Sequence, residues 1–203
     1  MSFEVALSRI AELQQMLAPP AAAQPTATTT QSFAGTMQMA STTGAITPLA
    51  SASPAGTPAG QAILNAIRPE VGVAEQPPGS NDSPRIAQYR QATAGSGVGP
   101  WCAYFVSWAA RSVGAPLGEQ GQGFGSVEQV WDWAQRSGKA IPAGTQPPQT
   151  GDLIVWGGRH IGMVESVDPD GTIHTIEGNS SDRVSQRTYG PDGGGATGFV
   201  RLG

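Results

Sequence analysis

Length, charge and cysteine content already exclude several classes of protein. The chain has 203 residues, a formal net charge of −4 at pH 7 and a single cysteine, Cys102. Because contacts to phosphate supply most of the affinity for nucleic acid, the lack of any Lys or Arg cluster argues against DNA or RNA as a partner. One cysteine cannot form an intramolecular disulfide. No run of about 18 apolar residues is present, so we expect no membrane span.

Charged residues divide the chain into parts. They occur in the first twelve positions and again after Ile67, whereas the stretch between consists mainly of Ala, Thr, Pro, Ser, Gly and Gln. So few large apolar side chains cannot offset the entropy lost when a backbone is ordered, roughly 1–2 kcal/mol per residue. We therefore predict a disordered linker over residues 18–60 and one folded domain over residues 61–203, which holds every Trp and Tyr.

Residues 1–17 have the pattern of a short amphipathic helix that ends before Pro19. Apolar side chains recur at spacings of three and four, at Phe3, Ala6, Ile10, Leu13 and Leu17. An isolated helix of this length is marginal in water, so we expect its apolar stripe to meet a partner, a second copy or the folded domain. Charged residues interrupt the apolar run that a secretory signal needs. If the substrate lies outside the cytoplasm, export therefore has to use another route.

In the folded part, the hydrophobic period changes from about 3.6 residues to about 2 after the Pro-rich turn at 147–148. Helices are predicted over 61–68, around 86–89, over 102–113 and over 127–137, the last with a capping box of Ser126 and Gln129. Strands are predicted over 152–156, 160–167, 172–177, 183–189 and 197–202. Helices followed by an antiparallel meander indicate an α+β fold, with the helices packed on one face of the sheet.

Cys102 is the candidate nucleophile. It follows the glycine-rich segment 95–100 and opens a predicted helix, so backbone N–H groups and the positive end of the helix dipole point at its sulfur. A cysteine attacks as the thiolate, which such a position stabilises, and the same N–H groups can form an oxyanion hole. Taken alone, the residue can equally be a small, buried apolar side chain.

A histidine has to supply the base, and the chain contains His160 and His174. Because side chains alternate along a strand, His174 points away from Glu177 on its own strand, whereas His160 on the neighbouring strand can lie opposite that carboxylate. We therefore predict His160 as the base and His174 as a structural or surface residue. A carboxylate or an amide fixes the ring, which makes Glu177 and Asn179 candidates to orient it. The alternative is that this segment is only a polar exit from a strand.

Four segments together resemble the CHAP domain of cysteine- and histidine-dependent amidohydrolases and peptidases. They are NDSPRIAQYR, GPWCAYFVSWAARSVG, TGDLIVWGGRHIGMVESV and GTIHTIEGNSS, and they run through most of residues 66–203. The resemblance implies a papain-like domain that hydrolyses amide bonds in bacterial peptidoglycan. It also implies that Cys102 is the nucleophile, that His160 is the general base and acid, and that Glu177 and Asn179 orient the ring.

The same resemblance implies a thioester acyl-enzyme and neither a metal nor another cofactor. Some relatives bind calcium, but the dense Asp ladder of such a site is missing around Asn81 and Asp82. Trp101, Tyr104 and Trp156 are candidates to line a substrate groove, or alternatively to fill the core. The bond cleaved is either the amide of N-acetylmuramoyl-L-alanine or a peptide bond of the stem or cross-bridge, and the sequence leaves both open.

Other interpretations compete with that of a peptidoglycan hydrolase. They are a non-catalytic wall-binding or adaptor module, a phage-type lysin, and another papain-like thiol enzyme; the complete Cys, His, Glu and Asn set argues against lost catalysis. The start of the chain, with SFAGTMQMA at 32–40, resembles wall hydrolases associated with the flagellar rod. That resemblance implies an extracytoplasmic location, export by the flagellar type III route without a standard secretory signal, and a rod or export component that binds residues 2–17.

Overall fold

Four α-helices occupy the first part of the described chain. The structure, a computed structural model, describes residues 56–203, so the predicted helix at 1–17 and most of the predicted linker lie outside the described residues. The helices are α2 (Pro58–Ile67), α3 (Pro84–Arg90), α4 (Cys102–Ser112) and α5 (Val127–Arg136), and a 3₁₀ turn, Arg68–Glu70, follows α2. None of these described helices is long and apolar enough to cross a bilayer.

Helix α2 begins before residue 61, where we predicted the folded domain to start. The Thr57 hydroxyl accepts a hydrogen bond from the Gly60 N–H, and Pro58 occupies the first helical position. Both features are typical of a helix start. Because Ile63 and Ile67 on this helix are fully buried, α2 is an integral part of the domain from its first turn.

The strands form one antiparallel sheet. They are β1 (Ala140–Pro142), β2 (Leu153–Trp156), β3 (His160–Val167), β4 (Ile173–Glu177), β5 (Ser185–Tyr189) and β6 (Gly198–Val200), in the spatial order β1-β6-β2-β3-β4-β5. The predicted meander holds for β2 to β5, but β6 returns to pair with β2 and also carries β1. The sequence prediction omits β1 because three residues are too few to show an alternating pattern.

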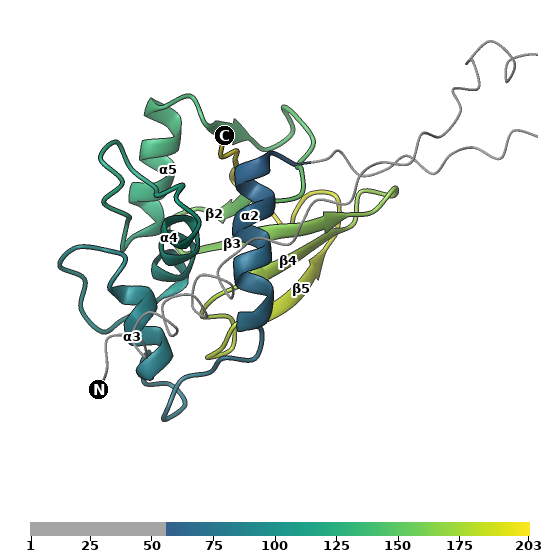
Figure 1. Cartoon of the computed structure of the whole chain (residues 1–203). Helices are drawn as coiled ribbons and strands as arrows, with labels where there is room; N and C mark the ends of the chain where they lie inside the picture. The colour runs from purple at the N-terminus through teal and green to yellow at the C-terminus, as the bar shows by residue number, and fades with distance from the viewer. Residues whose placement is uncertain (1–55) are drawn as a thin grey trace, which may run out of the picture. The chain divides into compact units, whose positions relative to one another are not determined.

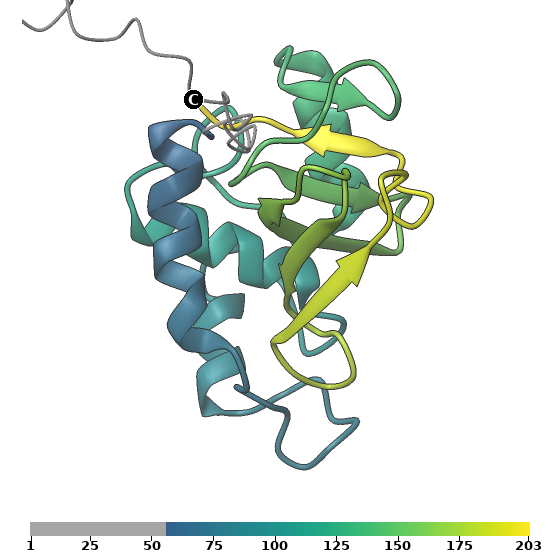
Figure 2. The same cartoon turned by 90° about the vertical axis from the view of Figure 1, so that its right-hand side faces the viewer.

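The helices gather on one side of the sheet (Figures 1 and 2). Alternation along β2 explains the layering, because Leu153 and Val155 belong to the main core with the helices, whereas Ile154 and Trp156 belong to a smaller apolar cluster. Each face of the sheet therefore has its own apolar cluster. The predicted α+β fold, with helices packed on an antiparallel sheet, is confirmed.

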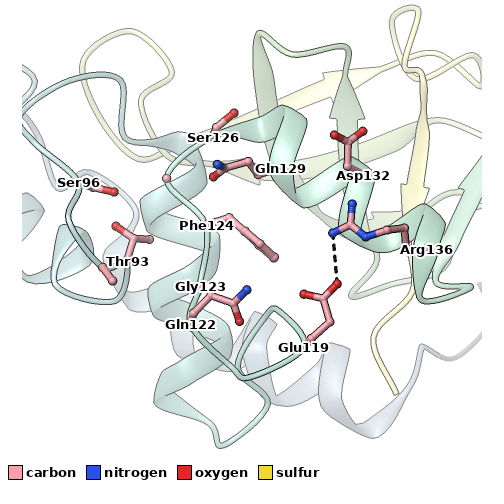
Figure 3. Close-up of a pocket in the computed structure, with 12 residues that line it drawn as sticks. Thr93, Ser96, Glu119, Gln122, Gly123, Phe124, Ser126, Gln129, Asp132 and Arg136 are labelled. Atoms are coloured by element: carbon pink, nitrogen blue, oxygen red, sulfur yellow. Dashed lines mark hydrogen bonds and ion pairs between the residues drawn. The ribbon is translucent and has the colours of Figure 1, made fainter.

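The capping box predicted at the start of α5 is wrong. Ser126 is the N-cap residue, but its side chain makes no capping hydrogen bond. Ser126 and Gln129 both line a surface cavity (Figure 3). Neither side chain therefore turns back onto the first N–H groups of the helix, as a capping box would require.

Candidate active site

The thiol of Cys102 lies at the first residue of α4. Pro100 disfavours helical backbone in the residue before it, and Trp101 is the N-cap residue. The side chain of Trp101 makes no capping bond, so first-turn N–H groups are left to face an anion at this end of the helix. Cys102 is only 4% exposed. The fold thus places a shielded thiol where a helix N-terminus stabilises negative charge.

The imidazole of His160 lies between Cys102 and Glu177. His160 begins β3, and its Nε2 lies 2.9 Å from Oε2 of Glu177, which leaves Nδ1 as the nitrogen for Cys102. Burial lowers the pKa of His160, but hydrogen bonds and charge interactions with Cys102 and Glu177 outweigh that effect and raise the pKa to about 9. The ring also stacks on Trp156, with centroids 5.5 Å apart. The hydrogen bond to Glu177 and the stacking on Trp156 therefore hold the ring in one orientation.

The carboxylate of Glu177 is buried, and both of its oxygens make hydrogen bonds. Its Oε1 accepts from the Thr175 hydroxyl at 2.7 Å and from the Tyr189 hydroxyl at 2.8 Å, while Oε2 faces His160. Burial raises the pKa of Glu177, but hydrogen bonds from His160, Thr175 and Tyr189 outweigh it and hold the pKa below its usual value. Strand alternation places Thr175 on the same face as Glu177, whereas no pattern in the sequence pointed to Tyr189.

Two glycines let the elements of the site approach one another. A Cβ atom at Gly162 would lie 2.6 Å from Cγ of Glu177, and one at Gly178 would lie 2.7 Å from Cβ of Phe105. Gly162 therefore makes room for the carboxylate beside β3, and Gly178 lets α4 pack closely on the end of β4. The sequence analysis missed both residues, because a glycine within a strand or just after it is a signal only when its spatial neighbour is known.

His174 lies away from this cluster. Its Nε2 is 2.8 Å from Oδ2 of Asp168, and its Nδ1 is 3.2 Å from the Thr188 hydroxyl. The side chain is partly exposed, and its partner Asp168 is exposed as well. His174 therefore belongs to the surface of the hairpin formed by β3 and β4.

The hydrogen bonds of Asn179 go to groups other than the imidazole, so the structure does not support the prediction that Asn179 orients His160. With the amide oriented to suit both neighbours, its oxygen accepts from the Trp101 N–H at 3.1 Å and its nitrogen donates to Glu75 at 3.3 Å. The physical reason is the bend of the chain after β4, where Asn179 has a φ of 58° and its side chain turns towards the start of α4. Asn179 therefore holds the residue before Cys102.

Glu75 completes this support, and the sequence analysis missed it. It is 3% exposed, and its carboxylate accepts from Nε1 of Trp101 at 2.9 Å and from the Asn81 N–H at 2.8 Å. Glu75 lies in an irregular loop well before Cys102 in the chain. No hydrophobic period and no motif spacing in the sequence therefore connects Glu75 with Cys102. Only the folded chain brings this carboxylate to the start of α4.

The predicted substrate-binding aromatic residues have different surroundings. Trp101 is fully buried, so its prediction as a substrate-binding residue is wrong: the indole is used for packing and for the bond to Glu75. Tyr104 is 7% exposed, and its hydroxyl donates to the Gly97 carbonyl. Trp156 is the one of the three that lines a cavity beside His160.

Of two surface cavities, one is lined by His160. The smaller, about 280 Å³, is lined by Trp156, Arg159, His160, Tyr189 and Gly194. The larger, about 550 Å³, lies between residues 93–96 and α5, where polar side chains surround Phe124 and Glu119 pairs with Arg136 (Figure 3). The larger cavity contains none of the predicted catalytic side chains, so the smaller one belongs to the site. Within residues 56–203, no three His, Cys, Asp or Glu side chains gather as metal ligands would.

Comparison with known proteins agrees with this geometry. Residues 93–179 match the family model of the CHAP domain. The chain contains a CHAP domain. The matched range includes Cys102, His160, Glu177 and Asn179, so every predicted catalytic residue lies within the CHAP domain. No curated protein matches the chain.

Among solved structures, the chain is similar to the peptidoglycan hydrolase RipB from Mycobacterium tuberculosis. The identity is 18% and the TM-score is 0.41. The alignment covers 70% of this chain and 64% of that chain.

Proposed function

We propose that the chain is a peptidoglycan hydrolase that cleaves an amide bond with Cys102 as its nucleophile. One arrangement carries the proposal: a thiol at a helix N-terminus, an imidazole that interacts with it, and a buried carboxylate 2.9 Å from the other side of the ring. Nucleophile, base and orienting group in this order are what thiol hydrolases need. The CHAP match, which covers all three residues, supports the same reaction class.

The reaction follows from the contacts. The Cys102 thiolate attacks the carbonyl carbon, and a C–S bond forms while the carbonyl oxygen becomes an oxyanion that the first-turn N–H groups of α4 stabilise. The C–N bond then breaks as the His160 imidazolium gives its proton to the departing amine. In the second half, neutral His160 takes a proton from water, the resulting hydroxide attacks the thioester, and the thiolate leaves. Glu177 keeps the ring in position and stabilises its charged form throughout.

The substrate bond is either the amide between muramic acid and L-alanine or a peptide bond of the stem or cross-bridge. Both are secondary amides between an acyl group and an amine, so the same three side chains serve either reaction. The choice belongs to the surfaces around the thiol, which include the cavity beside His160.

Digestion of purified peptidoglycan sacculi tests the proposal. We expect the full chain to release soluble fragments, Cys102→Ala to release none, and His174→Ala, which changes a histidine outside the site, to remain active. Mass spectrometry of the new termini identifies the bond. Release of no fragment from several wall types by folded, reduced protein would instead support a wall-binding or adaptor module.

We further propose that this hydrolase acts outside the cytoplasm, in local remodelling of the wall during flagellar assembly. The support is in the sequence: an amphipathic pattern at 2–17 and an uncharged Ala/Thr/Pro-rich tract that resemble flagellum-associated hydrolases. In this proposal residues 2–17 bind a rod or export component, and the tract lets the CHAP domain reach the wall.

A further inference from the structure

Arg159 differs from every other arginine in residues 56–203. The other eight each donate a side-chain hydrogen bond to an oxygen atom of the protein. The guanidinium of Arg159 has no such partner among the described residues, and the residue is exposed. A guanidinium carries five N–H donors in a rigid, planar fork that matches a carboxylate. This one is free to bind an anion from outside the protein.

The guanidinium of Arg159 is carried by a turn that is next to His160. It lies in the turn between β2 and β3, directly before His160, and its N–H donates to the Trp156 carbonyl at 3.3 Å. Trp156 in turn stacks on the imidazole. The backbone that carries the guanidinium is therefore fixed relative to the catalytic ring by short contacts.

The cavity of about 280 Å³ beside His160 has the chemistry to receive a peptide residue. Trp156 and Tyr189 supply ring surfaces whose centroids are 5.0 Å apart, and Arg159 supplies positive charge. The Glu177 carboxylate does not compete for this charge, because it is 1% exposed and already bonded. The carboxylate of Glu128 on α5 lies close to the neighbouring Gly158, where a Cβ atom would be 2.5 Å from its Oε1. A carboxylate that enters here meets a guanidinium that has no ion-pair partner within residues 56–203.

We propose that Arg159 binds a carboxylate of the substrate, and that this cavity is the subsite for the residue that carries it. The inference rests on the proposed function, because the stem peptides of peptidoglycan bear free carboxylates on glutamate, diaminopimelate and the terminal D-alanine. His160 has to reach the departing nitrogen, so a cavity lined by His160 lies on the leaving side of the bond. The recognised carboxylate therefore belongs to the fragment that is released with the new amine.

Calorimetric binding of soluble stem peptides to the full chain tests this subsite. Cys102→Ala is used as the background so that no ligand is cleaved. Three matched ligand pairs each have one carboxylate, that of glutamate, diaminopimelate or the terminal D-alanine, converted to a carboxamide. For one pair we expect the carboxamide to bind about tenfold more weakly, the size of a charged hydrogen-bonded contact. That pair also identifies which residue occupies the cavity.

Arg159→Ala on the same background should remove the preference. We expect this substitution to weaken binding of the free-acid ligand about tenfold and to leave binding of the carboxamide ligand unchanged. The effects of the protein substitution and of the ligand change are then coupled rather than additive. Arg159→Lys keeps the charge but not the fork and should give an intermediate value. Arg111→Ala is the control, because Arg111 lies about 13 Å further along α4 than Cys102 and donates to the Gly121 carbonyl.

The outcomes separate this subsite from the proposed hydrolysis. Coupling between Arg159 and one carboxylate, with no fragments released from sacculi by the wild type, would keep the subsite and overturn the hydrolase. Release of fragments together with additive effects, or with no binding of any stem peptide, would overturn the subsite. If Arg159→Ala shifts the pH dependence of binding equally for both members of a ligand pair, Arg159 acts on the charge of His160 and not on a substrate carboxylate. That result would also overturn the subsite.

Discussion

At the residue scale, the proposed reaction of Cys102 depends on the side chains that hold the imidazole of His160. Glu177 holds His160 at 2.9 Å, and the hydroxyls of Thr175 and Tyr189 occupy the other carboxylate oxygen. Because both oxygens of the carboxylate accept hydrogen bonds, the carboxylate has one favourable orientation, and so has the imidazole that it binds. The buried charge is stable only as part of this group.

Replacement of Glu177 by Gln tests that dependence. The amide has nearly the same shape but no charge, so it no longer stabilises the imidazolium. We expect turnover of sacculi to fall about 100-fold or more, within the range found for general acid–base groups. Glu165→Gln, which changes a carboxylate that pairs with Arg68 at the surface, should leave turnover unchanged. A Glu177→Gln rate within about twofold of the wild type would contradict this role.

The protonation of His160 gives a second test. Its pKa is raised to about 9, so we expect NMR of the ring to show titration near pH 9 in the wild type and at lower pH in Cys102→Ala, where the thiolate is absent. Hydrolysis should decline as pH rises through about 9, because neutral imidazole cannot protonate the departing amine. An unchanged titration in Cys102→Ala would show that Cys102 is not the cause.

The same shift links pH to stability. A histidine pKa that is higher in the folded state stabilises the fold fully below its unfolded value and loses that contribution as pH rises through the folded value. For Glu177 the shift is downward, so its contribution is present above its unfolded pKa and is lost in acid. Both groups therefore favour the folded domain at neutral pH.

At the element scale, the site exists because α4 meets the end of β4 and the start of β3. Gly178 lets Phe105 of α4 approach the backbone after β4, and Gly162 leaves room for Glu177 beside β3. A side chain at either glycine would separate elements that must stay within hydrogen-bonding reach.

Gly162→Ala is the direct test of this packing. The new methyl group would lie 2.6 Å from Cγ of Glu177, so the carboxylate or the strand has to move. We expect a loss of about 1–3 kcal/mol in the free energy of unfolding, as for other overpacked sites, and a clear fall in turnover. Denaturant unfolding and sacculus digestion measure the two. Gly97→Ala, where a Cβ meets no atom within 4 Å, is the matched control; equal behaviour of both variants would refute the packing argument.

At the scale of the whole molecule, the first and last residues of the described domain are in contact. The Thr57 hydroxyl donates to the Leu202 carbonyl, and Leu202 is 5% exposed. The first turn of α2 is thereby fixed to the last residues of the chain. The boundary between the folded domain and the N-terminal segment therefore lies before Thr57, not at residue 61 as predicted.

Two truncations follow from this arrangement. Deletion of residues 1–55 should leave digestion of purified sacculi unchanged, while cell fractionation should show loss of the proposed delivery. Deletion of residues 1–61 also removes the Thr57 cap and the first turn of α2, and we expect it to cost about 1 kcal/mol or more of stability, visible as a lower melting temperature. Loss of digestion in the shorter deletion would contradict a role in delivery alone.

The sequence by itself determined much of the architecture and the central pair of the site. Apolar periods located α4, α5 and the strands from β2 to β6, because these periods are local properties of the chain. The choice of His160 over His174 followed from strand alternation alone. The resemblance to the CHAP domain came from motifs that are each continuous in sequence, and the family match agrees with it.

Only the tertiary structure decided which residues support that pair. Asn179 and Glu75 hold Trp101 at the start of α4, and Tyr189 reaches Glu177 from β5. These contacts join segments that are far apart along the chain. No period or spacing encodes them, because they depend on how closely helices and strands pack and on which buried polar groups still need partners. The physics that is local to a segment can be read from its residues, whereas hydrogen bonding between segments is settled only when the core has formed.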